Sequence, residues 1–542
     1  MKRSIFLLVA VAGGMLALGL MAGNAFAAPQ SCEGLANLTL PNTKVVSTGV
    51  VAAGAFTPPA GLPAWIAGDP AFYKTLPAFC RVTMEDKPTT DSDIMMEVWL
   101  PVSGWNGKFR GQGNGGFAGQ MSYAALGVAV QQGYASAATD TGHAAEATNA
   151  SWALGHPEKI VDFGHRAIHE MTVLGKATAK AFYGDAPKRA YFANCSNGGR
   201  QALMEAQRYP DDYDGILAGA PANYWTHLLA SALWDAQATT NDPANYIPSS
   251  KVPAIAKAVL AACDASDGVK DGIIDDPRTC HFDPTTMVCK EGDTDSCLTK
   301  PQVTALKKLY EGAHDSMGKA IFPGFVAGGE EGDGGWALWI TGPAPAKALL
   351  FAFGNGYFAN MVYGQADWDY KKASLDDAVK ASDDKFANVL NAVQADMKAF
   401  KAHGGKLIIY HGWSDAAISP LNAIKYYDSV VQEMGKPESD AFLRLYMVPG
   451  MQHCGGGPGP DDFGEFGISR INDPQHNIYM ALENWVEKGE APGTVIASKA
   501  SGMGPAAKVT MTRPLCAYPQ VAKYKGSGDT NDAANFVCAA PK

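Results

Sequence analysis

Two parts of the chain carry short apolar runs separated by longer stretches in which apolar residues recur at helical spacing. Short apolar runs bounded by Gly, Asn or Asp are typical of buried strands, and the longer spacing is typical of helices packed on a sheet. In the first part this pattern predicts strands over 94–101, 134–142, 189–194 and 215–221, with helices over 161–184 and 198–210. Strands that alternate with helices in this way predict an α/β fold with a largely parallel sheet.

The alternation stops near Pro221 and resumes with apolar runs at 406–412 and 442–450. The intervening stretch differs in composition, with four cysteines, a loop rich in Asp and Gly, and many aromatic residues. A chain of 542 residues also exceeds the usual size of a single hydrophobic core. We therefore predict a core in two parts, 28–221 and 396–542, with a large inserted lid domain at 222–395.

The chain begins with the features of a secretory signal peptide. Lys2 and Arg3 precede an apolar run that ends in the small-residue sequence Ala25-Phe26-Ala27. An uncleaved membrane anchor is the alternative, but the run is Gly-rich and no later stretch has the roughly 18 apolar residues of a membrane span. Residues 1–27 are therefore predicted to be removed, which leaves an exported protein, periplasmic or extracellular, with no membrane segment in its mature form.

Charge and cysteine content narrow the possible partners and the compartment. The net charge of −10 becomes −12 when Lys2 and Arg3 are removed, and an acidic chain without a basic run is a poor candidate for binding nucleic acid. All ten cysteines follow the predicted cleavage site, and an even number suggests five disulfides. No cysteine lies in a CxxC pair, so a zinc site is not expected. Spacing favours the local pairs Cys32–Cys80, Cys263–Cys280, Cys289–Cys297 and Cys516–Cys538, which leaves Cys195 and Cys454.

Ser196 is the candidate nucleophile because it stands between an apolar strand and a Gly-rich helix start. A serine on such a turn is exposed at the end of the sheet in α/β-hydrolases. The usual pattern is GxSxG, whereas residues 194–198 read Asn-Cys-Ser-Asn-Gly, so the first glycine is missing. Taken alone, the motif is also compatible with an ordinary helix-capping serine.

Two later residues complete a possible catalytic set. Asp415 and His453 each follow an apolar strand, and the order Ser, acid, His is that of α/β-hydrolases. Either residue could instead be an ordinary loop residue. If the three meet, Ser196 and His453 lie within about 3 Å of each other, and their neighbours Cys195 and Cys454 come within disulfide range. The fold also requires two oxyanion donors. We expect the N–H of Asn197 to be one, and the N–H of a glycine in the 111–119 loop to be the other, with Gly116 the first candidate and Gly115 the second.

These segments resemble the tannase and feruloyl esterase family, which also contains the hydrolase of mono(2-hydroxyethyl) terephthalate. The resemblance lies in "NCSNGGRQALMEAQRYPDDYDGILAGAPA", "HGWSDAAISP" and "PGMQHCGGGPGPDDF", and it extends over nearly the whole mature chain. It implies an α/β-hydrolase core with an inserted lid and a bond between Cys195 and Cys454. It is specific for the family and only weakly informative about substrate.

The loop "CDASDGVKDGIIDDPRTC" is a candidate calcium site. Three carboxylates within eight residues, Asp264, Asp267 and Asp271, suit a hard cation, although the spacing is not that of an EF-hand. The alternative is a solvated acidic turn. The family resemblance implies one structural Ca²⁺ held by these three side chains and by the carbonyls of Val269 and Ile273. Because the loop is in the insertion, we expect it to lie away from the catalytic segments; no organic cofactor is expected.

Aromatic residues of the insertion suggest the substrate class. One group could stack a flat phenolic ring or could form the core of the insertion: Trp336, Trp339, Phe351, Phe353, Tyr357 and Phe358. No arginine occurs between Arg278 and Arg444, which argues against a substrate with a free carboxylate such as the terephthalate monoester, although lysines remain. We predict a secreted serine esterase that forms an acyl-enzyme with small esters of hydroxycinnamic or hydroxybenzoic acids, with plant cell walls or tannins as candidate sources. A hydrolase of mono(2-hydroxyethyl) terephthalate or related aromatic monoesters is the alternative within the family. A secreted serine peptidase and a non-catalytic binding module are the alternatives of other classes.

Overall fold

The computed structural model describes Met1 and residues 29–502 and 507–541, so the predicted signal peptide lies outside the described residues. The central element is a nine-stranded sheet with the strand order β1-β2-β3-β5-β4-β6-β7-β10-β11. Its strands are β1 (Thr43–Val51), β2 (Phe79–Asp86), β3 (Ile94–Pro101), β4 (Lys108–Gly111), β5 (Ala135–Thr139), β6 (Arg189–Cys195), β7 (Gly215–Gly219), β10 (Lys406–Gly412) and β11 (Leu443–Val448). The strands from β5 to β11 in this order pair in parallel, and β1, β2 and β3 form an antiparallel edge.

Helices cover both faces of the sheet, as the sequence predicts for an α/β-hydrolase core. The alternation of β6 shows why both faces are apolar: Phe192 points into a core shared with one set of helices, and Tyr191 points into the core on the other face. The first set is α5 (Ala167–Tyr183), α6 (Asn197–Arg208) and α14 (Leu421–Met434); the second is α3 (Tyr123–Gln131) and α16 (Ile478–Lys488). This architecture confirms the predicted fold class.

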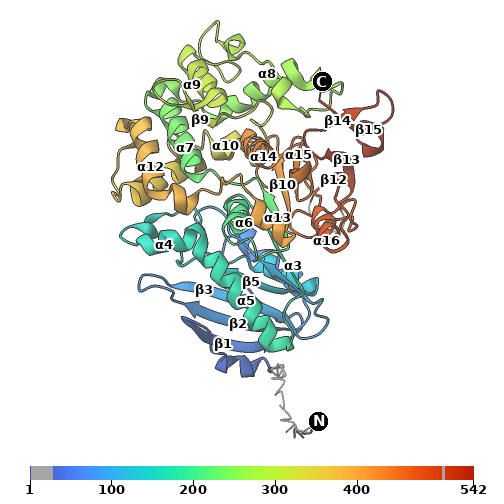
Figure 1. Ribbon diagram of the computed structural model, residues 1–542. Coiled ribbons are helices and arrows are strands. Elements are labelled where there is room, and N and C mark those ends of the chain that lie inside the picture. Colours follow the sequence, from blue (N-terminus) through green and yellow to red (C-terminus); the bar gives the residue numbers. More distant parts are fainter. Residues whose placement is uncertain (2–28, 503–506, 542) are drawn as a thin grey trace.

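The chain leaves the sheet after β7 and returns to it at β10. The segment between them is mainly helical, and Figure 1 shows its green to orange helices gathered at one end of the molecule, above the sheet. Its longer helices are α7 (Trp225–Thr240), α8 (Val252–Cys263), α9 (Lys300–Glu311), α11 (Leu349–Gly356) and α12 (Leu375–Leu390), and α10 (Trp336–Trp339) is a single turn. Two apolar clusters hold this segment together, one of which also contacts the core through Phe117 and Phe163.

The C-terminal segment adds two small antiparallel hairpins, β12 (Thr494–Ala500) with β13 (Val509–Cys516) and β14 (Val521–Tyr524) with β15 (Phe536–Ala539). Figure 1 shows β14 and β15 on the side of the molecule where α8 lies, with β12 and β13 below them toward α16, and Arg513 of β13 contacts Asp271 of the insertion. Within the described ranges, no helix is long and apolar enough to cross a lipid bilayer.

All five predicted disulfides are present, which confirms the pairing expected from spacing and from the family resemblance. The local pairs are Cys32–Cys80, Cys263–Cys280, Cys289–Cys297 and Cys516–Cys538. The fifth joins Cys195 to Cys454 across 259 residues, with 5.9 Å between the two Cα atoms. It connects the end of β6 to the loop that follows β11.

Candidate active site

Ser196 occupies a strained turn between β6 and α6. Its φ of 66° and ψ of −126° place it in a region that non-glycine residues rarely adopt, and such strain clusters at functional sites. Asn194 fills the space that the missing glycine of the GxSxG pattern would leave open, and its side chain accepts a hydrogen bond from the N–H of Cys195. Gly198 permits this, because a β-carbon there would lie 2.1 Å from Asn194 Oδ1. The turn therefore keeps the elbow geometry with a different residue at its first position.

Ser196, His453 and Asp415 form one hydrogen-bonded chain. The Ser196 hydroxyl lies 2.9 Å from Nε2 of His453, and Nδ1 of His453 lies 2.8 Å from Oδ2 of Asp415. Because a carboxylate only accepts hydrogen bonds, Nδ1 carries the imidazole proton and Nε2 is free to accept the serine proton. The structure thus brings together the three residues that sequence analysis selected as nucleophile, base and acid.

Asp415 is fully buried and is held by four donors. Its Oδ1 accepts hydrogen bonds from the N–H groups of Ala417 and Ile418, and its Oδ2 accepts from His453 and from His411. Burial alone would raise the pKa of this carboxyl group, but the nearby charge of His453 and the bonds from both imidazoles outweigh burial and hold the pKa below its ordinary value. Asp415 is therefore ionised throughout the neutral range.

His411 is a component of the site that sequence analysis missed. It is the penultimate residue of β10 and is completely buried, with Nε2 3.0 Å from both Asp415 Oδ2 and the Ile418 carbonyl oxygen. Both neighbours accept hydrogen bonds, so Nε2 must carry the proton. His411 and His453 therefore share one carboxylate oxygen, and His411 fixes the position of Asp415. The only sequence signal is a histidine at the end of an apolar strand, four residues before the acid.

The two candidate oxyanion donors lie beside the nucleophile. Asn197 is the first residue of α6, so its N–H has no partner within the helix. Gly116 lines the same cavity with a φ of +55°, and a β-carbon there would come within 2.4 Å of the Ala147 carbonyl oxygen. Gln201 of α6 ties this helix to the loop that carries Gly116. Its Oε1 accepts a hydrogen bond from the backbone N–H of Asn114, and its Nε2 donates one to Asn114 Oδ1.

The cavity at Ser196 is small and apolar, with a volume of about 70 Å³. Apart from the indole N–H groups of Trp225 and Trp339, its polar side chains belong to Ser196, Asn197 and His453, and none of the described residues that line it is charged. Trp339 of the insertion packs edge-on against the His453 ring at 5.1 Å between centroids. The remaining lining residues are apolar, namely Ala222, Trp225, Leu228, Leu229, Ala232, Leu350, Phe353, Ala417 and Ile418.

The aromatic residues selected from the sequence divide between two roles. Trp339 and Phe353 line the cavity, whereas Trp336, Tyr357 and Phe358 are buried in the clusters of the insertion. Phe351 packs against Tyr370 and does not reach the cavity. Sequence analysis missed the larger contribution of α7, which begins six residues after β7 and supplies Trp225, Leu228, Leu229 and Ala232.

A wider groove of about 1190 Å³ is lined in part by Cys454. Its walls carry acidic residues, among them Glu331, Asp333, Asp461 and Asp462, but neither Ser196 nor His453. The small cavity is therefore the candidate active site, because it joins the hydroxyl, the imidazole and the oxyanion donors.

The predicted calcium loop has an all-oxygen donor set that suits Ca²⁺. Asp264 and Asp267 turn their carboxylates toward loop N–H groups, and Asp271 also pairs with Arg513 of β13 at 2.6 Å. Burial, followed by repulsion from the neighbouring acids, raises the pKa of Asp267, so a bound cation would stabilise its ionised form. Calcium binding stays a prediction.

The location of this loop differs from expectation. A β-carbon added at Gly450 would lie 3.2 Å from Cγ2 of Ile273, so the loop packs against the turn that precedes His453. The expectation that the loop lies away from the catalytic segments was wrong, because the insertion folds back over the end of β11.

Comparisons with known proteins agree with this geometry. Residues 80–539 match the family described as "Tannase and feruloyl esterase". The chain is 41% identical over 538 residues to an uncharacterized esterase of Xanthomonas campestris pv. campestris, with 94% of this chain and 91% of the relative covered. It is 34% identical over 466 residues to a probable feruloyl esterase B of Aspergillus clavatus, covering 85% of this chain and 86% of the relative.

The same family appears among solved structures. The crystal structure of feruloyl esterase B from Aspergillus oryzae superposes with a TM-score of 0.85 at 30% identity, and the match covers 95% of this chain and all of that one. The chain therefore belongs to the tannase and feruloyl esterase family and is a carboxylic ester hydrolase.

Proposed function

We propose that this esterase hydrolyses small esters of phenolic acids, hydroxycinnamic acids such as ferulic acid foremost, through an acyl-enzyme on Ser196. The observation that carries the proposal is the hydrogen-bonded chain from Ser196 through His453 to Asp415 at the mouth of an uncharged apolar cavity. The names of the feruloyl esterase relatives support the same class of substrate.

In the proposed first step, His453 Nε2 takes the hydroxyl proton while Ser196 Oγ bonds to the ester carbonyl carbon. The carbonyl oxygen becomes an oxyanion, which accepts hydrogen bonds from the N–H groups of Asn197 and Gly116. Asp415 stabilises the imidazolium without taking its proton. The intermediate then collapses, the bond to the alcohol oxygen breaks, and His453 gives the proton to the departing alcohol.

In the second step water replaces the alcohol. His453 takes a proton from water, the hydroxide oxygen bonds to the acyl carbon, and the bond to Ser196 Oγ breaks as the proton returns to the serine. The phenolic acid leaves, and the enzyme is restored. Neither step requires a metal or an organic cofactor; Ca²⁺ bound by Asp264, Asp267 and Asp271 would be structural.

The lining of the cavity favours the binding of uncharged, weakly polar acyl groups. A terephthalate monoester would have to bury its free carboxylate, and no charged side chain lines the described cavity to pair with it. A gallate would have to bury several hydroxyl groups among few polar groups, namely the side chains of Ser196, Asn197 and His453 and the indole N–H groups of Trp225 and Trp339. We expect methyl ferulate to be a better substrate than methyl gallate, and both to exceed the terephthalate monoester.

A substrate panel tests this order. Initial rates on methyl ferulate, methyl gallate, chlorogenate and mono(2-hydroxyethyl) terephthalate should rank with the ferulate ester first. The highest kcat/KM on the terephthalate monoester would contradict the proposal. A peptide substrate separates the esterase from a serine peptidase, because we expect no peptide cleavage.

Phe353 and Phe351 offer a matched pair for locating the phenolic ring. Phe353 lines the cavity, and Phe351 stands two residues away on the other side of α11. Phe353→Ala should lower kcat/KM for methyl ferulate by about tenfold, since an aromatic contact and its buried area contribute about 1–2 kcal/mol. Phe351→Ala should leave kcat/KM within about twofold of wild type.

We also propose that the protein is exported with residues 1–27 removed. The five disulfides support an oxidising compartment. The N-terminal sequence of the protein recovered from culture medium or periplasm should begin near Ala28; recovery with Met1 retained would contradict this.

A further inference from the structure

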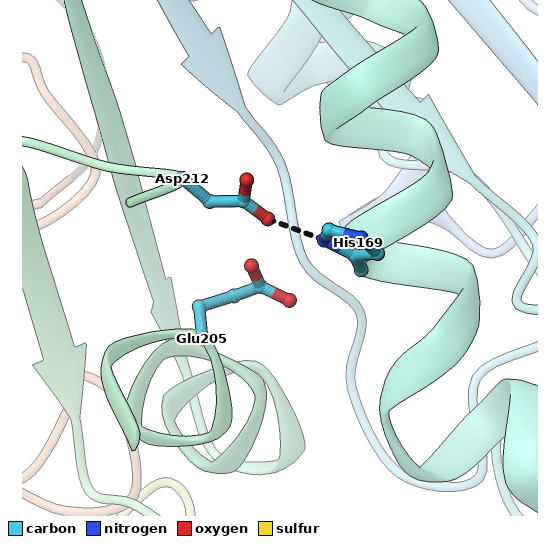
Figure 2. Close-up of side chains that lie close together, drawn as sticks. All are labelled: His169, Glu205 and Asp212. Carbon is cyan, nitrogen blue, oxygen red and sulfur yellow. Dashed lines mark hydrogen bonds and ion pairs between the residues drawn. The ribbon is translucent and has the colours of Figure 1, made fainter. Parts of the chain in front are cut away.

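A second cluster of chemically competent side chains lies away from the cavity at Ser196. His169 on α5, Glu205 on α6 and Asp212 in the turn before β7 bring one ligand atom each within 4.8 Å of one another. It is the only such group of three or more His, Cys, Asp or Glu side chains among the residues that the structure describes. Figure 2 shows the Glu205 carboxylate pointing toward the gap between the other two side chains.

Glu205 is the residue that requires an explanation. It is 1% exposed, and neither of its carboxylate oxygens has a hydrogen-bond partner among the described residues. A carboxylate buried without a partner is costly, so this position must hold either a proton or a cation.

The neighbouring groups favour a cation. His169 lies flat on Tyr209 at 3.9 Å between ring centroids, which fixes its ring, and its Nδ1 lies 2.6 Å from Asp212 Oδ2. The His169 side chain is 29% exposed and that of Asp212 12%, so two of the three side chains reach the surface. Glu205 stands in the last turn of α6, where the helix dipole attracts positive charge.

One positive group is already present. Lys176 of α5 donates a hydrogen bond to the backbone carbonyl of Asp212. It bonds to neither oxygen of Glu205, whose carboxylate stays unpaired. Lys176 therefore compensates part of the negative charge without occupying the gap.

We propose that His169, Glu205 and Asp212 form a binding site for a divalent transition-metal cation such as Zn²⁺. One imidazole and two carboxylates suit such a cation, whereas Ca²⁺ prefers oxygen ligands alone. Ligand atoms around one zinc stand about 3.3 Å apart at bond lengths of about 2.0–2.1 Å. The three ligand atoms lie within 4.8 Å of one another here, so binding requires them to move closer by about 1.5 Å at most. The cation would join α5 to the far end of the helix whose first turn carries Asn197.

The test is zinc binding to the full-length mature enzyme without an affinity tag. The protein is stripped with chelator and then titrated with ZnCl₂ by calorimetry while Ca²⁺ is kept saturating, so that the separate calcium loop does not contribute. We expect one Zn²⁺ per chain and a rise in melting temperature. Glu205→Gln and His169→Gln should each weaken binding by at least about tenfold.

Glu170→Gln is the matched control, because it removes a carboxylate next to His169 that is not part of the cluster. It should bind Zn²⁺ as wild type does. Absence of zinc binding by the wild-type protein, or equal affinity in Glu205→Gln and wild type, would overturn the proposal and leave a proton on Glu205. His169→Gln gives an independent answer if Glu205→Gln does not fold.

Discussion

Removing the disulfide between Cys195 and Cys454 should reduce both stability and catalysis, and the structure separates the two effects. The bond closes a loop of 259 residues, and each of its cysteines directly neighbours a residue of the hydrogen-bonded chain. In the chain-entropy treatment, a loop of this length contributes about 5.5 kcal/mol to the free energy of unfolding. At about 2.1 cal/mol/K per residue for the unfolding entropy, this corresponds to a fall in melting temperature of about 5 °C.

The expected loss of catalysis comes from a change in the position of His453 relative to Ser196. His453 Nε2 lies 2.9 Å from Ser196 Oγ, and the disulfide joins the two backbones one residue away on each side. A displacement of about 1 Å can cost about 100-fold in rate. We expect the double variant Cys195→Ala/Cys454→Ala to lose about 10- to 100-fold in kcat. The change in KM should be smaller, because most residues that line the cavity lie outside the two segments that the bond joins.

The matched control is Cys289→Ala/Cys297→Ala, which removes a disulfide that spans only 8 residues. The same treatment gives about 2.5 kcal/mol for this bond, or about 2 °C. Its kcat should stay within about twofold of wild type. Both variants are assayed on methyl ferulate at 25 °C, after circular dichroism has shown that they are folded. A wild-type kcat in the folded Cys195→Ala/Cys454→Ala variant would refute the reasoning.

Three further predictions concern pH and metal dependence. His411→Phe removes one of the two imidazole hydrogen bonds to Asp415 Oδ2, so Asp415 should stabilise protonated His453 more strongly. The acidic limb of the pH profile of kcat/KM should therefore move to higher pH. An acidic limb at the wild-type pH would contradict this role of His411. Burial raises the pKa of Asp140 to about 7, above its unfolded value of about 3.9, so this carboxyl group makes the free energy of unfolding fall as pH rises between those values. Chemical unfolding of Asp140→Asn should therefore show a gain over wild type that grows from about pH 4 to 7, and a pH-independent difference would rule this out. Chelation of Ca²⁺ should lower the melting temperature more than the initial rate, and Asp271→Asn should abolish that calcium dependence; an unchanged melting curve would count against the calcium site.

The central strands could be predicted from sequence because their signal is local. The run "KLIIYHG" coincides with β10, and "IMMEVWLP" coincides with β3. In a sheet covered on both faces most positions of a strand are apolar, so a short, largely apolar run between turn residues is sufficient. In the antiparallel edge, β3 was predicted but β1 was not. β1 carries polar and apolar residues with most side chains partly exposed, so its sequence lacks a clear strand pattern.

The residues of the site also differ in how readily they could be predicted from the sequence. Ser196, Asp415 and His453 each follow an apolar strand, and that position relative to the strands is enough to select them. His411 lies within a strand, where a histidine resembles any other core residue because its contact with Asp415 depends on the fold of the following turn. Asn194 departs from the nucleophile motif, and the sequence does not show that its side chain packs in the space beside Gly198.

The sequence could not show which aromatic residues line the cavity and which form the core of the insertion. Trp336 and Trp339 lie on the same helical turn and are chemically identical, yet one is buried among the residues of the insertion and the other faces His453. The difference depends on how α10 packs against both the insertion and the core, which no local pattern records. The same holds for α7, whose apolar residues serve both the core of the insertion and the cavity.

The role of Ser196 as nucleophile is tested most directly by covalent labelling with a fluorophosphonate. The account predicts one adduct per mature chain, located by mass spectrometry on Ser196, with hydrolysis of methyl ferulate lost in proportion to labelling. Ser196→Ala should take up no label and should lose ester hydrolysis, while retaining its five disulfides and its melting temperature. An adduct on another residue, or full esterase activity in folded Ser196→Ala, would contradict the account.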